Sequence, residues 1–154
     1  MKHQEVLAAI RDVKDFPVEG IIFKDITTVL SNPEYLKWMK DEIVNLYRAY
    51  GITKVVGIES RGFILGPAVA MDLGAGFVPV RKPGKLPAET IEVSYAKEYG
   101  VDTIQIHADA LSEDDVVLLH DDLLATGGSM AAALELVRKF NVKKVYINFI
   151  IELE

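Results

Sequence analysis

One stretch decides the fold of this chain: VVLLHDDLLATGGS, at residues 116–129. It opens with a short run of valine and leucine, which is typical of a buried parallel strand. After the acidic pair and the glycines, apolar residues recur at helical spacing over residues 130–137. The stretch therefore predicts a strand, two adjacent carboxylates, a glycine loop and a helix, in that order.

This order of elements suits a phosphorylated sugar as ligand. Two glycines let the backbone come close to a ligand, and the free N–H groups and dipole at the helix start favour a phosphate. Asp121 and Asp122 would repel that phosphate, but they can accept hydrogen bonds from sugar hydroxyls or hold a metal ion through water. A ribose 5-phosphate with further phosphate at C1 offers all these groups. The alternative is an ordinary strand-to-helix turn, which the acidic pair and the hydroxyls of Thr126 and Ser129 disfavour.

Composition excludes several classes of protein. Half of the 154 residues are hydrophobic and about a quarter are charged, as in ordinary globular domains. The absence of cysteine excludes disulfides, thiolate metal sites and a cysteine nucleophile. The N-terminus predicts an amphipathic helix rather than a signal peptide, and the apolar run at residues 62–71 is too short to span a membrane. We therefore expect a single domain over residues 1–154, cytoplasmic and without a membrane partner.

The distribution of charge matters more than its sum. A net charge of −6 argues against a nucleic-acid partner, which would need a basic surface. Arg81, Lys82 and Lys85 nevertheless place three positive charges in five residues, with no acid among them. Such a local cluster can bind a small anion in a cleft despite the negative total.

Strand patterns alternate with helix patterns along most of the chain. The expected strands are residues 55–58, 77–80, 116–120 and 145–151, a first helix is expected at residues 2–13, and two apolar segments at 91–95 and 103–107 could pair as a hairpin. This alternation predicts an α/β fold with a parallel sheet flanked by helices. Ligands of such sheets bind beyond the carboxyl ends of the strands. Three polar segments lie there, at residues 59–61, 81–82 and 121–122, so we assign them to one site.

The motif DDLLATGGS, residues 121–129, resembles the phosphoribosyl pyrophosphate (PRPP) signature of type I phosphoribosyltransferases. In this form it is most similar to the adenine phosphoribosyltransferases, and the resemblance covers nearly the whole chain. It implies the type I fold, with a small N-terminal base-binding hood at residues 1–32 and a mobile β-hairpin loop at residues 81–100. It also implies a set of PRPP- and AMP-binding residues: Asp121, Asp122, Ala125, Thr126, Gly127, Gly128 and Ser129.

The segment GIIFKDIT, residues 20–27, resembles the base-binding segment of that family. The resemblance implies that Ile22, Phe23 and Lys24 bind adenine, with backbone groups reading the base and the Phe23 ring stacking on it. Taken without the family, the segment predicts an edge strand with Phe23 in the core. The family more often has arginine at the position of Lys24.

The segment ESRG, residues 59–62, resembles the pyrophosphate loop, which in the family contains a cis peptide before the serine. Ser60 and Arg61 would then bind pyrophosphate, and the Arg61 guanidinium would donate two parallel hydrogen bonds to it. The alternative is a solvated arginine at a helix start. That placement opposes the helix dipole, so an anion explains it better.

Residues 81–100 resemble the mobile catalytic loop. The resemblance implies that Lys82 and Lys85 contact the leaving pyrophosphate and that Glu98 exchanges a proton with N7 of adenine. It also implies a homodimer in which Arg81 reaches the partner's site. The alternative for such a charged loop is a plain surface excursion, which its length disfavours because long loops in compact domains are often lids.

The resemblance implies a purine-salvage transferase that makes AMP and pyrophosphate from adenine and PRPP. Glu98, Arg61 and Lys82 would be the catalytic residues, and Mg²⁺ would arrive with the substrate, near Asp121 and Asp122, without a direct protein site. The alternatives are another purine base (hypoxanthine, guanine or xanthine) or a PRPP-sensing regulator. Besides Lys24, His120 departs from the family, in which valine or isoleucine is usual at this position, and we interpret it as a partly buried structural histidine.

Overall fold

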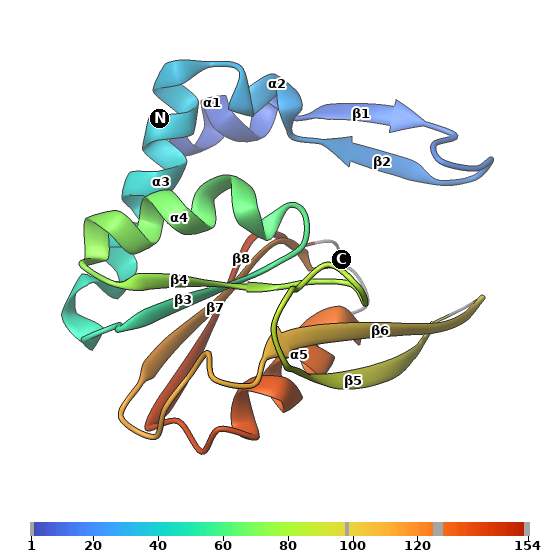
Figure 1. The fold of residues 1–154 in the computed structure, drawn as a ribbon. Coiled ribbons are helices and arrows are strands. Elements are labelled where there is room, and N and C mark those ends of the chain that lie inside the picture. Colours follow the sequence, from blue (N-terminus) through green and yellow to red (C-terminus); the bar gives the residue numbers. More distant parts are fainter. Residues whose placement is uncertain (1, 98, 125–127, 153–154) are drawn as a thin grey trace. The chain divides into compact units, whose positions relative to one another are not determined.

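The computed structural model describes residues 2–97, 99–124 and 128–152 (Figure 1). The chain divides into two compact units, Met1–Ile43 and Val44–Glu154. The helix α3, Pro33–Tyr47, begins in the first unit and ends in the second. That residues 1–32 form a hood, and that the whole chain acts as one domain, therefore remain predictions.

The first unit contains a two-stranded antiparallel sheet among short helices. Its elements before α3 are α1 Lys2–Ala9, β1 Arg11–Lys14, β2 Ile22–Asp25 and α2 Thr27–Leu30. The predicted helix at residues 2–13 was therefore too long, because its last part pairs with β2, with Arg11 opposite Asp25. A long turn separates the two strands, so the spacing of the apolar residues within 2–13 does not indicate this pairing.

Asp25 connects three parts of the first unit. The backbone N–H and the hydroxyl of Thr27 donate to its Oδ1 at 2.9 and 2.6 Å, and Nε of Arg11 donates to its Oδ2 at 3.0 Å. The Thr27 hydroxyl and amide, together with the Arg11 guanidinium, lower the pKa of Asp25 to about 2. The ionised carboxylate thus joins β1 to the end of β2 and the start of α2.

The second unit is built on a parallel sheet, as predicted. The strands β3 Lys54–Ile58, β4 Gly76–Val80, β7 Val116–Leu124 and β8 Lys144–Glu152 lie in the order β4-β3-β7-β8, and all neighbours are parallel. A 3-10 turn, η1 Arg48–Tyr50, leads from α3 into it. None of the helices within the described residues is long and apolar enough to cross a membrane.

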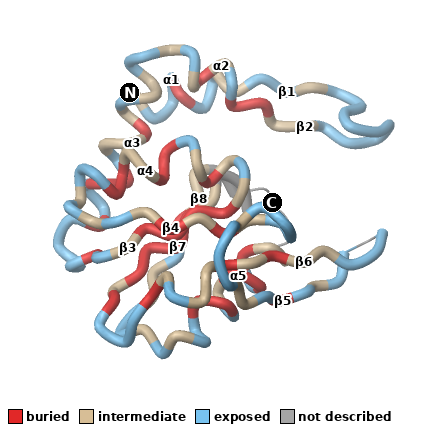
Figure 2. Tube along the Cα trace, viewed as in Figure 1, coloured by how far each residue is buried: buried red, intermediate tan, exposed pale blue. Residues whose placement is uncertain are grey.

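Helices and a hairpin cover this sheet. The helix α4 Gly62–Leu73 packs against β3, β4 and β7, and α5 Gly128–Arg138 packs against β7 and against the hairpin of β5 Thr90–Lys97 and β6 Gly100–His107 (Figure 1). The hairpin predicted from residues 91–95 and 103–107 is thus confirmed. Between sheet, α5 and hairpin lies a buried core, drawn red in Figure 2, that includes Val56, Val80, Ile106, Leu119 and Leu136.

The acidic pair does not close β7, contrary to the sequence-based expectation. The strand continues to Leu124, so both aspartates lie inside it. The cause is the staggered pairing of the sheet: β3 stops pairing with β7 at Gly57 and His120, whereas β8 continues to pair up to Leu124 and Glu152. Asp121 therefore lies past the end of β3 but is still held by β8.

Candidate active site

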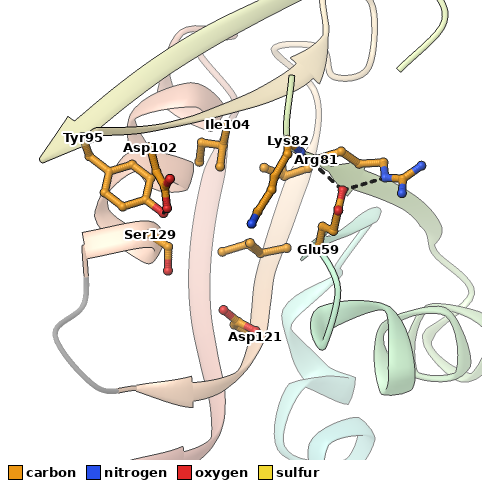
Figure 3. Close-up of a pocket in the computed structure, with 10 residues that line it drawn as sticks. Glu59, Arg81, Lys82, Tyr95, Asp102, Ile104, Asp121 and Ser129 are labelled. Carbon is orange, nitrogen blue, oxygen red and sulfur yellow. Dashed lines mark hydrogen bonds and ion pairs between the residues drawn. The ribbon is translucent and has the colours of Figure 1, made fainter. Parts of the chain in front are cut away.

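A cavity of about 200 Å³ lies at the carboxyl ends of β3, β4 and β7 (Figure 3). The loops after β3 and β4, the end of β7, the first turn of α5 and the hairpin all contribute to it. Its lining residues are Ile58, Glu59, Val80, Arg81, Lys82, Tyr95, Asp102, Ile104, Asp121 and Ser129. Each of the three polar segments assigned to one site from the sequence places at least one residue here.

Two glycines let the loop after β3 fold back tightly. A Cβ on Gly57 would lie 2.6 Å from the carbonyl oxygen of Gly62 and 2.8 Å from the Phe77 ring, and a Cβ on Gly62 would lie 2.9 Å from the carbonyl oxygen of His120. Only glycine fits at either position without movement of the backbone. Between them the peptide joining Glu59 and Ser60 is cis, as the resemblance implied.

Glu59 and Arg81 form an ion pair at the edge of the cavity. Nε of Arg81 donates to Oε1 of Glu59 at 2.8 Å, and the backbone N–H of Lys82 donates to the same oxygen at 3.3 Å. Burial raises the pKa of the Glu59 carboxyl, but these two hydrogen bonds and the nearby charges of Arg81 and Lys85 outweigh it, so the net shift is downward. Glu59 is therefore a carboxylate that fixes the start of the loop after β4.

The predicted pyrophosphate-binding residues take different positions. Lys82 lines the cavity, and in Figure 3 its side chain points into it. Lys85 is exposed and outside the lining, although its charge reaches Glu59. Ser60 and Arg61 are also outside the lining: Ser60 is exposed, and Arg61 is half-buried at the start of α4.

Among the predicted PRPP-binding residues, Asp121 and Ser129 line the cavity. Gly128 begins α5 beside Ser129. Asp122 follows in β7, but its side chain lies outside the described part of the chain, as do Ala125, Thr126, Gly127 and the predicted proton carrier Glu98. Their roles remain predictions.

The hairpin adds three residues that the sequence analysis missed. Tyr95 and Asp102 are direct register partners, and Ile104 is the next residue on the same face of β6. The signal lies in the period-two pattern: Tyr95 continues the apolar series Ile91 and Val93, and Asp102 continues Ile104 and Ile106. A polar residue that extends an apolar strand face beyond the core is a candidate for the rim of a site.

The predicted adenine-binding residues lie in the first unit, on β2. Ile22 is exposed, and Phe23 is half-buried with its ring edge-to-face against Phe16 at 5.2 Å between centroids. Nζ of Lys24 lies 2.6 Å from Oδ1 of Asp12 on β1. Within the described residues β2 has a strand neighbour on one side only, so part of its backbone N–H and C=O groups point away from β1.

The charge of the cavity limits which ligand it can take. Two cations, Arg81 and Lys82, face three carboxylates, Glu59, Asp102 and Asp121. Among the described residues there is no group of three or more side chains that could hold a metal ion by itself. Together these residues suit a polyanion that brings its own divalent cation, because Mg²⁺ readily keeps its waters and binds through one carboxylate and substrate oxygens.

Comparison with known proteins agrees with this geometry. A model of the phosphoribosyl transferase domain matches residues 25–152. The adenine phosphoribosyltransferase of Bacteroides fragilis is 62% identical over 154 residues, which cover all of this chain and 86% of that protein. The match thus extends over both compact units.

Solved structures give the same result. The adenine phosphoribosyltransferase of Rhodothermus marinus shares 51% identity with a TM-score of 0.92, over 99% of this chain and 86% of that one. The enzyme of Giardia lamblia, solved with 9-deazaadenine, shares 46% identity with a TM-score of 0.94, over 100% of this chain and 87% of that one. By its domain match and by these relatives, the chain belongs to the phosphoribosyl transferase family and, within it, to the adenine phosphoribosyltransferases.

Proposed function

We propose that this chain transfers the 5-phosphoribosyl group of PRPP to adenine and releases AMP and pyrophosphate. The observation that carries the proposal is that Glu59, Lys82 and Asp121, which come from three separate motifs, line one cavity. The relatives named above, called adenine phosphoribosyltransferases at 46–62% identity, support adenine as the base.

The end of β7 and the start of α5 hold the ribose phosphate. Asp121 accepts hydrogen bonds from the ribose hydroxyls, and Asp122 shares this task. Residues 125–129 bind the 5′-phosphate at the helix start, where N–H groups and the dipole favour an anion. Binding at the phosphate positions C1, which lies several bonds away, for attack by the base.

The pyrophosphate leaves towards Lys82, with Arg61 and Lys85 as further contacts. As the C1–O bond lengthens, positive charge develops on the ribose and negative charge on the leaving group, which these cations stabilise. We propose that Mg²⁺ enters as the PRPP complex, because the three carboxylates of the lining would otherwise repel the substrate. When bound, Mg²⁺ would supply positive charge at the pyrophosphate oxygens.

The base forms a bond from N9 to C1 and loses one proton overall. We assign the exchange of that proton at N7 to Glu98, as a general acid or base. On β2, the backbone groups that point away from β1 can read the purine edge, and Phe23 supplies a ring for stacking. Lys24 forms an ion pair with Asp12. If backbone groups read the base, lysine in place of the family's more common arginine should change adenine binding only slightly.

The remaining parts of the proposal concern the assembly and its place in the cell. A homodimer in which Arg81 reaches the partner's site requires this side chain to exchange its bond with Glu59 for one across the interface. The proposal also includes a mobile loop at residues 81–100 that closes over the substrates and excludes water. We further propose a cytoplasmic location, which the cysteine-free composition favours.

The deciding experiment is turnover of PRPP with a panel of bases. Adenine should give AMP and pyrophosphate, whereas hypoxanthine, guanine and xanthine should react much more slowly. A preference for one of the other bases would refute the choice of adenine, and PRPP binding without turnover of any base would favour a regulator. The variant Asp121→Asn/Asp122→Asn should lose most of its kcat/KM for PRPP, whereas Glu113→Gln/Asp114→Asn, an exposed adjacent acidic pair outside the cavity, should keep it.

A further inference from the structure

Asp102 is an unexpected residue in a cavity that takes polyanions. It lies on β6, and its side chain faces the cavity from the hairpin, across from Lys82 and Asp121 (Figure 3). Unlike Asp121, it is not part of the ribose-binding strand, and unlike Glu59 it has no arginine as its ion-pair partner among the described contacts. Its carboxylate therefore needs a separate explanation.

Asp102 is tied to its own hairpin by two contacts. Nζ of Lys97 lies 3.0 Å from its Oδ1, and the hydroxyl of Tyr95 donates to its Oδ2 at 3.5 Å. The Lys97 hydrogen bond and the charge of Lys82 lower the pKa of Asp102, although burial acts in the opposite direction. Burial and the charge of Asp102 raise the pKa of Tyr95. At neutral pH the pair is thus a carboxylate beside a neutral phenol.

We propose that Asp102 lowers the affinity of the cavity for pyrophosphate and so promotes the release of this product. This inference rests on the proposed function, which places pyrophosphate beside Lys82. The carboxylate opposes the polyanion directly through like charge, and it competes with the polyanion for the charge of the Lys82 ammonium group. The contacts with Tyr95 and Lys97 keep the carboxylate in the cavity instead of letting it turn to solvent.

The proposal predicts that removing the charge of Asp102 raises the affinity for pyrophosphate, whereas a merely structural role predicts that it lowers it. Removing a residue that shapes a site weakens binding, whereas removing a repelling charge strengthens it. Asp102→Asn keeps the size of the side chain and can still accept from the Tyr95 hydroxyl, so it removes chiefly the charge. One unit charge several ångströms from a polyanion in a solvated cavity is worth roughly three- to tenfold in affinity.

The experiment measures the dissociation constant of magnesium pyrophosphate by calorimetry for the full chain and its variants. Asp102→Asn should bind roughly three to ten times more tightly than the parent, and this difference should shrink at high salt because screening weakens charge repulsion. Asp102→Thr, which also removes the charge and suits a strand, should change the affinity in the same direction. Glu92→Gln is the matched control: it removes one charge from the same hairpin, outside the cavity, and keeps a partner for Gln105.

Each outcome decides the question. Affinity that is unchanged or weaker in both Asp102 variants, in a parent that makes AMP and binds pyrophosphate, would overturn this inference alone. Equal tightening in Glu92→Gln would also overturn it, because the effect would then come from the total charge of the hairpin. A parent that neither makes AMP nor binds pyrophosphate would refute the proposed function and this inference together.

Discussion

The buried pair of His120 and Asn148 allows a quantitative test of how β7 and β8 are joined beneath the site. The two residues are register partners, their exposed fractions are 1% and 8%, and Nδ1 of His120 donates to Oδ1 of Asn148 at 3.0 Å. Replacing either residue by an apolar one leaves the other with a buried polar atom that has lost its partner, which costs about 1–3 kcal/mol. Replacing both removes this penalty and leaves the cost of changed packing and of the lost hydrogen bond between Asn148 and Tyr47.

We therefore expect His120→Ile and Asn148→Val each to lower the free energy of unfolding by about 2 kcal/mol. The double variant should lose far less than the sum, with a coupling energy of about 1–3 kcal/mol. The free energies come from urea unfolding of all four proteins. A matched control is the exposed cross-strand pair Ser94 and Thr103, 2.7 Å apart, for which Ser94→Ala/Thr103→Val should show coupling below about 1 kcal/mol. Additive losses at His120 and Asn148 would refute the reasoning.

Three further predictions concern catalysis, pH and packing. Glu98→Gln should lower kcat by roughly 10²–10⁴ with little change in PRPP affinity, and single-turnover rates that match the parent would remove Glu98 from the proton transfer. Because the folded pKa of Asp25 is depressed to about 2, its contribution to stability is present above the unfolded value of about 4 and is lost as the pH falls towards 2. The difference in unfolding free energy between the parent and Asp25→Asn should shrink over that range; a constant difference would argue against it. Gly66→Ala places a Cβ 2.5 Å from the Phe77 ring and should cost about 1–3 kcal/mol in urea unfolding, whereas Gly76→Ala meets only the flexible Lys54 chain at 3.2 Å and should cost less.

Much of the sheet and part of the site could be predicted because their signals are local. The strands of the sheet are short apolar runs separated by helical spacing, and parallel pairing brings all their carboxyl ends to one edge. Lys82 and Asp121 could therefore be assigned to one site before any contact was known. Both residues line the same cavity, and their roles there remain predictions.

Other features depend on pairing partners that the local pattern does not specify. The local sequence pattern predicted that Arg11–Lys14 would continue the first helix, because only the pairing with β2 makes this segment extended. The period-two pattern places Asp102 at the end of an apolar strand face, but only the hairpin register sets it opposite Tyr95. His120 was expected to be partly buried, and its complete burial is explained by Asn148, which comes from β8 and supplies the polar partner.

Arg81 explains how the hairpin and the sheet come to share one cavity. Its backbone N–H donates to the carbonyl of Gln105 at 2.9 Å and its carbonyl accepts from Gln105 at 2.7 Å, so the residue that follows β4 forms an isolated antiparallel bridge to β6. Its side chain donates to Glu59 after β3 and lies over the Phe63 ring of α4 at 5.8 Å. One residue thus connects two sheet strands, a helix and the hairpin. Because Lys82 is the next residue, its position in the cavity is set by all four elements.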